Sequence, residues 1–511
     1  MLGLDLLLRL PADPRALFTT RAIRLFAYGL IGVLLVLFVK ALGVTDTLIG
    51  LFLTATLVGD ALVSLVVTGV ADRLGRRRML VLGSLLMAGA GLGFALVPAS
   101  DGSVMWAVTL TLLGIVGVIS PSGNECGPFM ALEQSILSNH IAPAARSLLF
   151  AWYNLIGYVA TAFGSLIAGA AVVLISGDSV NIFQTLLLVA SFAESPVAVL
   201  LGMGSRSAPL SSRNQTEEGF TKLEAYRYVV SAYGILGLIL AVRFARLSEA
   251  VEPRRISENA NVGAATSSSP RSPIHNAPAS GNNERAPLLP SQQPPSLPQR
   301  TSFGIRSILP GLDLSPESRW ITFKLCALFT LDSFAGSVVT GSILVYWFKS
   351  RFGVDEAYLG QILFVSNILA GMSSLAAGWI STRVGLVNTM VFTHLPSNVL
   401  MIMVPLMPNL FWSTIVLFLR YSISQMDVGP RQAYVASVTP AHERTAVIGL
   451  TNIVKSLGSA LGPLLAGVLV EKGYFDACFF VCGGGKIVYD LLLLWSFGGA
   501  AREAAALRRG E

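Results

Sequence analysis

Long apolar blocks separated by short polar loops follow one another along the whole chain. The block "TLIGLFLTATLVGDALVSLVVTG", which begins at Thr47, is typical. It exceeds the roughly 20 apolar residues that a helix needs to cross the core of a bilayer. Twelve such spans are present, at residues 24–42, 47–70, 78–98, 104–136, 147–175, 226–248, 319–348, 354–379, 385–407, 409–438, 444–470 and 474–498. The pattern predicts an all-α polytopic protein with twelve transmembrane helices.

Two stretches interrupt this alternation. Residues 249–318 are rich in Pro, Ser, Asn and Gln, which predicts a disordered cytoplasmic linker because so few apolar side chains cannot support a core. Residues 177–225 include one more apolar block, residues 183–204, which is broken by a glutamate and a proline. We interpret 177–225 as an inserted lumenal or extracellular loop, because the second half of the chain has no counterpart. A thirteenth span at 183–204 is the alternative.

An internal repeat divides the chain into two halves. "ALGVTDTLIG" at 41–50 matches "RFGVDEAYLG" at 351–360, and "SGNECGP" at 122–128 matches "SQMDVGP" at 424–430. Four residues of the fifth span, Arg146, Asn154, Gly164 and Gly169, have the same spacing as Arg444, Asn452, Gly462 and Gly467 in the eleventh. The repeat predicts two pseudo-symmetric six-helix bundles, at residues 1–248 and 319–498, and a cytoplasmic tail at 499–511.

Charge and composition narrow the class of protein. The net charge is +7, but only 13% of residues are charged and the basic ones lie mainly in short loops between apolar blocks. This favours a positive-inside bias over nucleic-acid binding. The four cysteines and four histidines have no metal-type spacing, and no phosphate-binding loop is present. We therefore expect no cofactor, no metal and no enzymatic activity.

The loop after the second span, "GVADRLGRRRML" at 69–80, concentrates four arginines and one aspartate. Together with the two six-span halves and the central linker, this loop resembles the major facilitator superfamily. The resemblance implies a gating role, in which Asp72 pairs across the two halves in the outward-open state and its pair breaks when the halves rock. By this resemblance, the residues of the gating loop are Asp72, Arg73, Gly75, Arg76 and Arg77. The alternative is that the arginines only fix the orientation of the chain.

Departures from the family pattern concern the same loop. Thr68 stands where the family has a glycine, and in the second half Thr382 replaces the acid. The gating role is therefore expected to be stronger in the first half.

Placing an ionisable side chain at membrane depth costs free energy, so each such residue is a candidate functional site. Glu125 and Asp427 are the sharpest pair, because they are equivalent in the fourth and tenth spans, which line the central cavity in the superfamily. We expect them to bind a proton or a cationic substrate, or else to cap helix ends. Further candidates are Asp332, Lys455, Asp60, Arg420, Asn154 and Asn452. Lys455 is expected to neutralise Asp427 or to bind an anion. For Asp60 and Arg420 the alternative is a structural ion pair, and for Asn154 and Asn452 it is a hydrogen bond between helices.

These features predict a secondary active transporter that moves a small solute by alternating access with proton coupling. A non-transporting solute sensor of the same fold is the alternative, and uptake and efflux are both open. We expect a monomer in the bilayer with cytoplasmic termini. Asn214 begins an "NQT" glycosylation sequon, and "ERAPLL", with Glu284, Leu288 and Leu289, resembles an acidic dileucine sorting signal. The membrane is therefore expected to be vacuolar or lysosomal, with the plasma membrane as the alternative.

Overall fold

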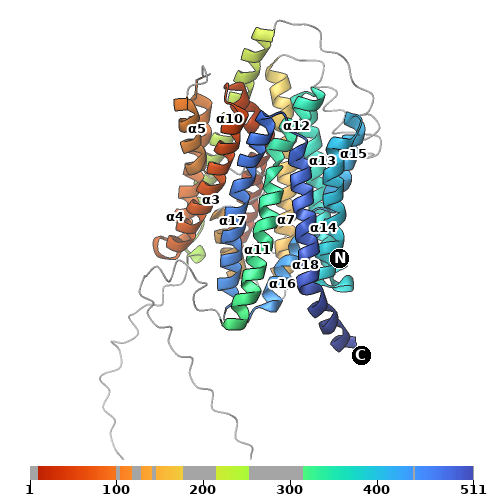
Figure 1. Ribbon diagram of the computed structural model, residues 1–511. Helices are drawn as coiled ribbons and strands as arrows, with labels where there is room; N and C mark the ends of the chain where they lie inside the picture. Colours follow the sequence, from red (N-terminus) through yellow and green to blue (C-terminus); the bar gives the residue numbers. More distant parts are fainter. Residues whose placement is uncertain are drawn as a thin grey trace, which may run out of the picture.

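The computed structural model describes residues 10–98, 104–117, 128–140, 146–176, 215–252, 315–440 and 443–509. Within these ranges all regular structure is helical, and most of the helices stand side by side in one upright bundle (Figure 1). Ten of the described helices are long and apolar enough to cross a membrane. The predicted all-α polytopic fold is confirmed.

The first half of the chain contributes five long helices and two short ones. The turn between the second and third of them lies at Gly75, whose φ of 101° suits a residue without a side chain. The helices are α2 (Ala12–Ala41), α3 (Asp46–Leu74), α4 (Arg76–Leu96), α5 (Val104–Val116), α6 (Pro128–His140), α7 (Arg146–Ile175) and α10 (Gln215–Ala245), followed by the 3-10 turn η2 (Glu249–Val251).

The second half repeats this order. Its turn equivalent to Gly75 lies at Gly385, with a φ of 89°. The helices are α11 (Pro316–Val338), α12 (Gly341–Phe352), α13 (Glu356–Val384), α14 (Leu386–Met403), the 3-10 turn η5 (Val404–Leu406), α15 (Leu410–Tyr421), α16 (Val428–Val438), α17 (Arg444–Glu471) and α18 (Ala477–Arg509).

The predicted tenth span is divided into two short helices, and the described parts of the fourth span are two short helices with residues 118–127 outside the described ranges. α5 ends at Val116 and α6 begins at Pro128, while α15 ends at Tyr421 and α16 begins at Val428. The turn before α16 has the sequence "SISQMD", which offers polar side chains in place of a continuous apolar run. Ten described helices have the length of a full span, because the fourth span is described only in part and the tenth is divided.

Several boundaries differ from those predicted, and α2 begins at Ala12 rather than at residue 24. α10 begins at Gln215, so residues 215–225 are helical rather than part of the predicted loop. α11 begins at Pro316, and α18 continues to Arg509 through most of the predicted tail. The block at 183–204 lies outside the described residues.

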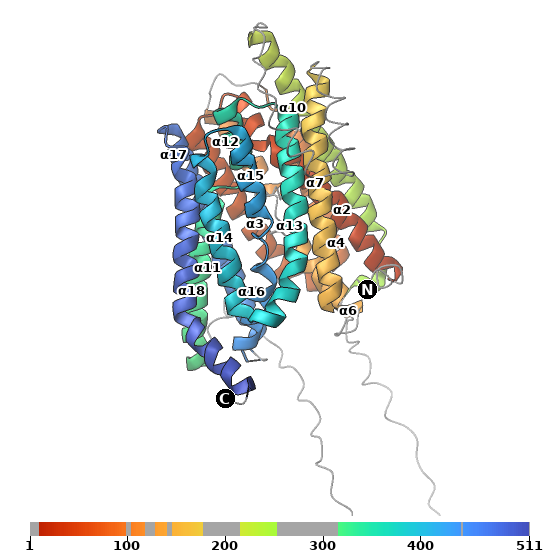
Figure 2. The same cartoon turned by 90° about the vertical axis from the view of Figure 1, so that its right-hand side faces the viewer.

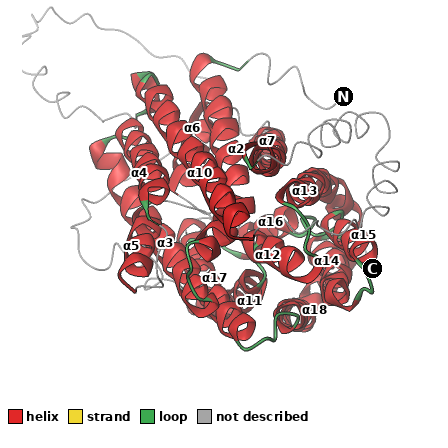
Figure 3. Ribbon diagram, turned by 90° about the horizontal axis from the view of Figure 1, so that it is seen from above, coloured by secondary structure: helices red, strands yellow, loops and turns green. Residues whose placement is uncertain are grey.

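The larger hydrophobic core is shared by both halves, a smaller one lies within the second half, and the halves meet mainly along two helix pairs. α2 packs against α7 and α10 in the first half, and α11 packs against α17 and α18 in the second. Between the halves, α7 lies along α13 (Figure 2) and α3 lies along α17 (Figure 3). α2 is deeply enclosed, because almost every residue from Leu25 to Val39 is buried.

Candidate functional site

The two halves touch closely near the turn between α2 and α3, which we call the α2–α3 end. A Cβ atom on Gly467 of α17 would lie only 2.9 Å from the Cα of Gly50 on α3. A Cβ atom on Gly360 of α13 would lie 3.3 Å from the Cα of Gly169 on α7. Gly50 and Gly360 are repeat partners, and so are Gly169 and Gly467. The internal repeat therefore supplies two equivalent backbone contacts between the halves.

Polar groups join the halves at the same end. The Tyr346 hydroxyl of α12 donates to Asp46 at 3.0 Å, and Lys40 pairs with the same carboxylate at 2.7 Å. Across the neighbouring contact, the Thr47 backbone N–H donates to Glu471 of α17 at 2.8 Å. These bonds hold α2 and α3 against α12 and α17.

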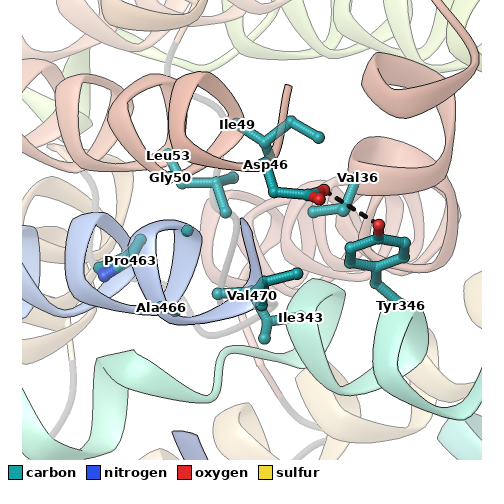
Figure 4. Close-up of a pocket in the computed structure, with 11 residues that line it drawn as sticks. Val36, Asp46, Ile49, Gly50, Leu53, Ile343, Tyr346, Pro463, Ala466 and Val470 are labelled. Atoms are coloured by element: carbon teal, nitrogen blue, oxygen red, sulfur yellow. Dashed lines mark hydrogen bonds between the residues drawn. The ribbon is translucent and has the colours of Figure 1, made fainter. Parts of the chain in front are cut away.

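A small pocket lies between these four helices (Figure 4). Apart from Asp46 and Tyr346, its lining is apolar, with Val36, Ile49 and Ile343 among the residues that face it. Its volume of about 20 Å³ has room for a single water molecule. The pocket is too small for a solute, so the α2–α3 end is sealed at this point.

A buried cluster of charged side chains lies within the second half, between α11, α14, α16 and α18. We call it the C-half polar cluster; its members are Asp332, His394, Asn398, Asp427, Arg431, Lys486 and Asp490. Asp332 of α11 accepts from Lys486 of α18 at 2.7 Å and from Arg431 of α16 at 2.9 Å. Arg431 also pairs with Asp427, one turn earlier, at 3.4 Å. One carboxylate thus joins three helices.

The other end of the C-half polar cluster is built on His394 of α14. Its Nδ1 lies 2.8 Å from the carboxylate of Asp490, which also accepts from Asn398 at 3.0 Å. Its Nε2 lies 3.5 Å from the Nζ of Lys486. Hydrogen bonds therefore connect the histidine to both anions that flank it, directly to Asp490 and through Lys486 to Asp332.

Sequence reasoning included Asp332 and Asp427 but missed the rest of this cluster. The available signal was "GGGKIVYD" at 483–490, where a lysine and an aspartate interrupt an apolar span. His394 was not a candidate, because the four histidines are scattered along the sequence without metal-type spacing. Only the packing of α14 against α18 brings His394 and Asp490 together.

The first half contains a separate buried charge pair. Arg24 of α2 donates to both oxygens of Glu133 on α6, each at 2.7 Å, and both side chains are fully buried. The Tyr153 hydroxyl donates to the same carboxylate. Arg21 lies over the Tyr153 ring and donates to Asn154 at 3.3 Å. Asn154 therefore has an interhelical partner on α2, whereas the sequence analysis missed Arg21, Arg24 and Glu133.

The remaining predicted charges and amides have varied surroundings. Asp60 is buried on α3, near the phenol of Tyr233 on α10. Lys455 is half-buried on α17, and Asn452 is exposed on the same helix. The ion-pair partner of Asp427 is Arg431, rather than the predicted Lys455.

Arg420 ends α15, directly before the division of the tenth span. Its guanidinium lies over the ring of Tyr421 at 4.9 Å and near the thiol of Cys482. Its Nε is buried and has no hydrogen-bond partner in the part of the chain that the structure describes. The predicted structural ion pair is thus not seen among those residues, and the cation has unused bonding capacity.

The loop at Gly75 is joined to the segment that follows α10. The backbone N–H groups of Arg76 and Arg77 donate to Glu252 at 2.6 and 3.1 Å, which places a carboxylate at the N-terminus of α4. Arg77 also donates from its side chain to the carbonyl of Leu247 at 3.1 Å. These contacts lie within the first half.

Several predicted residues cannot be placed in this geometry. The backbones of Asp72 and Arg73 form the last turn of α3, but their side chains are not described. Glu125, Asn214, Glu284, Leu288 and Leu289 lie outside the described residues altogether.

Comparison with known proteins settles the family. The model of the Major Facilitator Superfamily matches residues 17–426 and, in a second match, 325–510. The chain belongs to the major facilitator superfamily. The resemblance predicted from the repeat and the Gly75 loop is confirmed.

The chain is also similar to individual proteins. The chain is 28% identical over 487 residues to the uncharacterized membrane protein YJR124C of Saccharomyces cerevisiae, covering 95% of this chain and 94% of that one. A shorter match, 25% identical over 141 residues, is to Probable anion transporter 5 of Arabidopsis thaliana, covering 27% and 33% of the two chains. The crystal structure of a D-xylose-proton symporter has the same fold, with a TM-score of 0.59 at 12% identity, covering 94% of this chain and 96% of that one.

Proposed function

We propose that this multi-pass membrane protein is a secondary active transporter that moves a small solute by alternating access and couples it to protons. The observation that carries the proposal is the seal at the α2–α3 end. There the halves meet at the repeat-related glycines Gly50, Gly169, Gly360 and Gly467. Smooth backbone contacts of this kind let two rigid bodies separate without unlocking large side chains, as rocking of the halves requires.

The substrate site is proposed near the division of the tenth span. Discontinuous helices at the middle of the membrane form the binding sites of many transporters. At this division, Gln425 accepts from the Tyr158 hydroxyl of α7 at 3.0 Å, so both halves contribute to the region. Asp427 lies at the start of α16 and Arg420 at the end of α15.

A small anion is the solute class that we favour. The free Nε–H of Arg420 is a donor suited to carboxylate or phosphate oxygens. The name of the Arabidopsis relative, an anion transporter, points the same way. A cationic solute bound at Asp427 is less favoured, because that carboxylate is already paired with Arg431.

The proposed orientation places the Gly75 loop, the linker and both termini in the cytoplasm. The loop carries Arg73, Arg76, Arg77 and Arg78, and the positive-inside rule places such a loop on the cytoplasmic side. The α2–α3 end is then lumenal or extracellular, because it lies at the opposite end of α3. In this proposed orientation, the closed end is the lumenal or extracellular one.

Flux measurements test the transporter proposal. Metabolite profiles of cells with and without the protein identify the solutes whose levels change, and those solutes are then tested in proteoliposomes. We expect flux that follows a proton gradient, that is lost in Arg420→Gln and that is partly kept in Arg420→Lys. Solute binding without flux under any gradient would favour the sensor instead. Equal flux in wild type and Arg420→Gln would remove the anion site.

Location is tested separately. The dileucine motif supports vacuolar or lysosomal sorting. Replacing Leu288 and Leu289 with alanine in a tagged protein is expected to move it to the plasma membrane. An unchanged location would remove the sorting signal without affecting the transport proposal.

A further inference from the structure

The C-half polar cluster contains more negative than positive charges. Its three carboxylates, Asp332, Asp427 and Asp490, face two permanent cations, Arg431 and Lys486. All three aspartates are at least 93% buried as side chains, and Asp490 is completely so. An unbalanced charge within the membrane is unfavourable. The cluster therefore approaches neutrality only when it holds one additional proton.

The contacts indicate which pair of groups is left to take up this proton. Asp332 lies between Lys486 and Arg431, and Asp427 is paired with Arg431. Asp490 has no permanent cation within ion-pair distance among the described residues; its partners are His394 and Asn398. His394 is the remaining titratable member, and the ring of Tyr489 packs edge-on against it at 5.9 Å. The extra proton thus falls on the His394–Asp490 pair.

Other nearby groups do not change this assignment. Arg420 lies near Cys482, one turn before Lys486 on α18, and forms no ion pair with the three aspartates in the described part of the chain. No three His, Cys, Asp or Glu side chains among the described residues are placed to hold a metal ion.

We infer that His394 and Asp490 form the site that binds the coupling proton. This inference rests on the proposed transport function and names the residues that carry its proton. Proton uptake puts an N–H on both ring nitrogens of His394. The Nδ1–H then bonds to Asp490, and the Nε2–H faces Asp332, whose carboxylate lies 4.0 Å away.

Loss of the proton reverses these interactions. The neutral ring, with its remaining proton on Nδ1, offers the Nε2 lone pair to Lys486, only 3.5 Å away. Lys486 then divides its bonding between His394 and Asp332, so Asp332 depends more on Arg431 of α16. Because α16 directly follows the division of the tenth span, proton occupancy is linked to the half-helix beside the proposed solute site.

Proton binding is measured directly by nitrogen-15 NMR of the histidine ring. The full-length protein, with His140, His275 and His442 replaced by glutamine, is labelled at its single remaining histidine and placed in lipid nanodiscs. The ring shifts are followed over roughly pH 5 to 9, the range in which histidines titrate. We expect both nitrogens of His394 to move through one midpoint.

Two variants shift this midpoint in opposite directions. Asp490→Asn removes the anion next to the ring and is expected to lower the midpoint by about one to three pH units. Lys486→Met removes a neighbouring cation and is expected to raise it. Misfolding does not produce opposite shifts. Asp476→Asn is the matched control, because that carboxylate bonds to Trp347 outside the cluster, and it should leave the midpoint unchanged.

The possible results separate the proton site from the transport proposal. A ring that shows no titration, or a midpoint that is equal in wild type and Asp490→Asn, would overturn the site even if solute flux is found. Titration with the two opposite shifts supports the site. The absence of flux in such a protein would count against the transport function alone.

Discussion

Substituting Gly467 with alanine should open the α2–α3 end. The new Cβ would lie 2.5 Å from the backbone carbonyl of Asp46 and 2.9 Å from the Cα of Gly50. Both are backbone atoms, so no side chain can rotate away. Ordinary contact begins near 3.4 Å, so α17 must move away from α3 by about 0.9 Å, the difference between 3.4 and 2.5 Å.

The cost of this overlap falls on one conformation only. Forcing a methyl group into a well-packed contact costs about 1 to 3 kcal/mol. The state in which the halves have separated at this end does not bear that cost. The equilibrium should therefore shift toward the open state by about 5- to 150-fold.

Spin-label distances across the α2–α3 end measure this shift. Labels are placed at Ala41→Cys and Tyr474→Cys, two exposed positions on opposite halves. The background lacks the native thiols, which are Cys126, Cys326, Cys478 and Cys482. We expect Gly467→Ala to add a population at longer distance.

Gly449→Ala is the matched control, because it lies on the same helix α17 and a Cβ there would meet no atom within 4 Å. It should retain the distribution of the parent protein. The reasoning would be refuted if Gly467→Ala and Gly449→Ala gave the same distances. Gly50→Ala, on the opposite side of the contact, should behave like Gly467→Ala.

Three further predictions concern the first half. Glu133→Gln leaves the buried Arg24 without its counter-charge and should destabilise the fold by about 3 to 5 kcal/mol, seen as a lower midpoint of thermal unfolding; Arg24→Met combined with Glu133→Leu should recover much of the loss. Asp72→Asn should slow solute turnover at normal expression, whereas wild-type turnover would leave the loop a role in orientation only. Asn214 should carry a glycan, so glycosidase treatment should increase gel mobility, and chemical labelling of a cytoplasmic Asn214 would contradict the predicted topology.

The sequence alone determined the class of fold. Apolar blocks of bilayer length predict helices wherever they occur, because backbone polar groups in lipid must be satisfied within the segment. The internal repeat and the Gly75 loop were sufficient to identify the superfamily. Gly75 itself was predictable, because a turn between two long helices needs a residue that tolerates positive φ.

The division of the tenth span was harder to predict. Both of its halves are apolar, so hydropathy joins them, and only the polar run "SISQMD" marks the division. Helix boundaries also differ from the prediction. α10 begins at Gln215 because its first turns, although polar, continue the same helix beyond the apolar segment.

Tertiary structure alone decided which charges meet. His394 and Asp490 are 96 residues apart, and Arg24 and Glu133 are 109 apart. Nothing local in the sequence pairs them, because their partnership depends on which faces of α14 and α18, or of α2 and α6, turn toward one another. The repeat marked Gly50 and Gly467 as notable positions, but only the packing of α3 on α17 made them one contact. Hydropathy determines that a segment is a membrane helix. Side-chain packing across the whole bundle determines how each helix is rotated and which helices it contacts, and therefore which charged side chains meet.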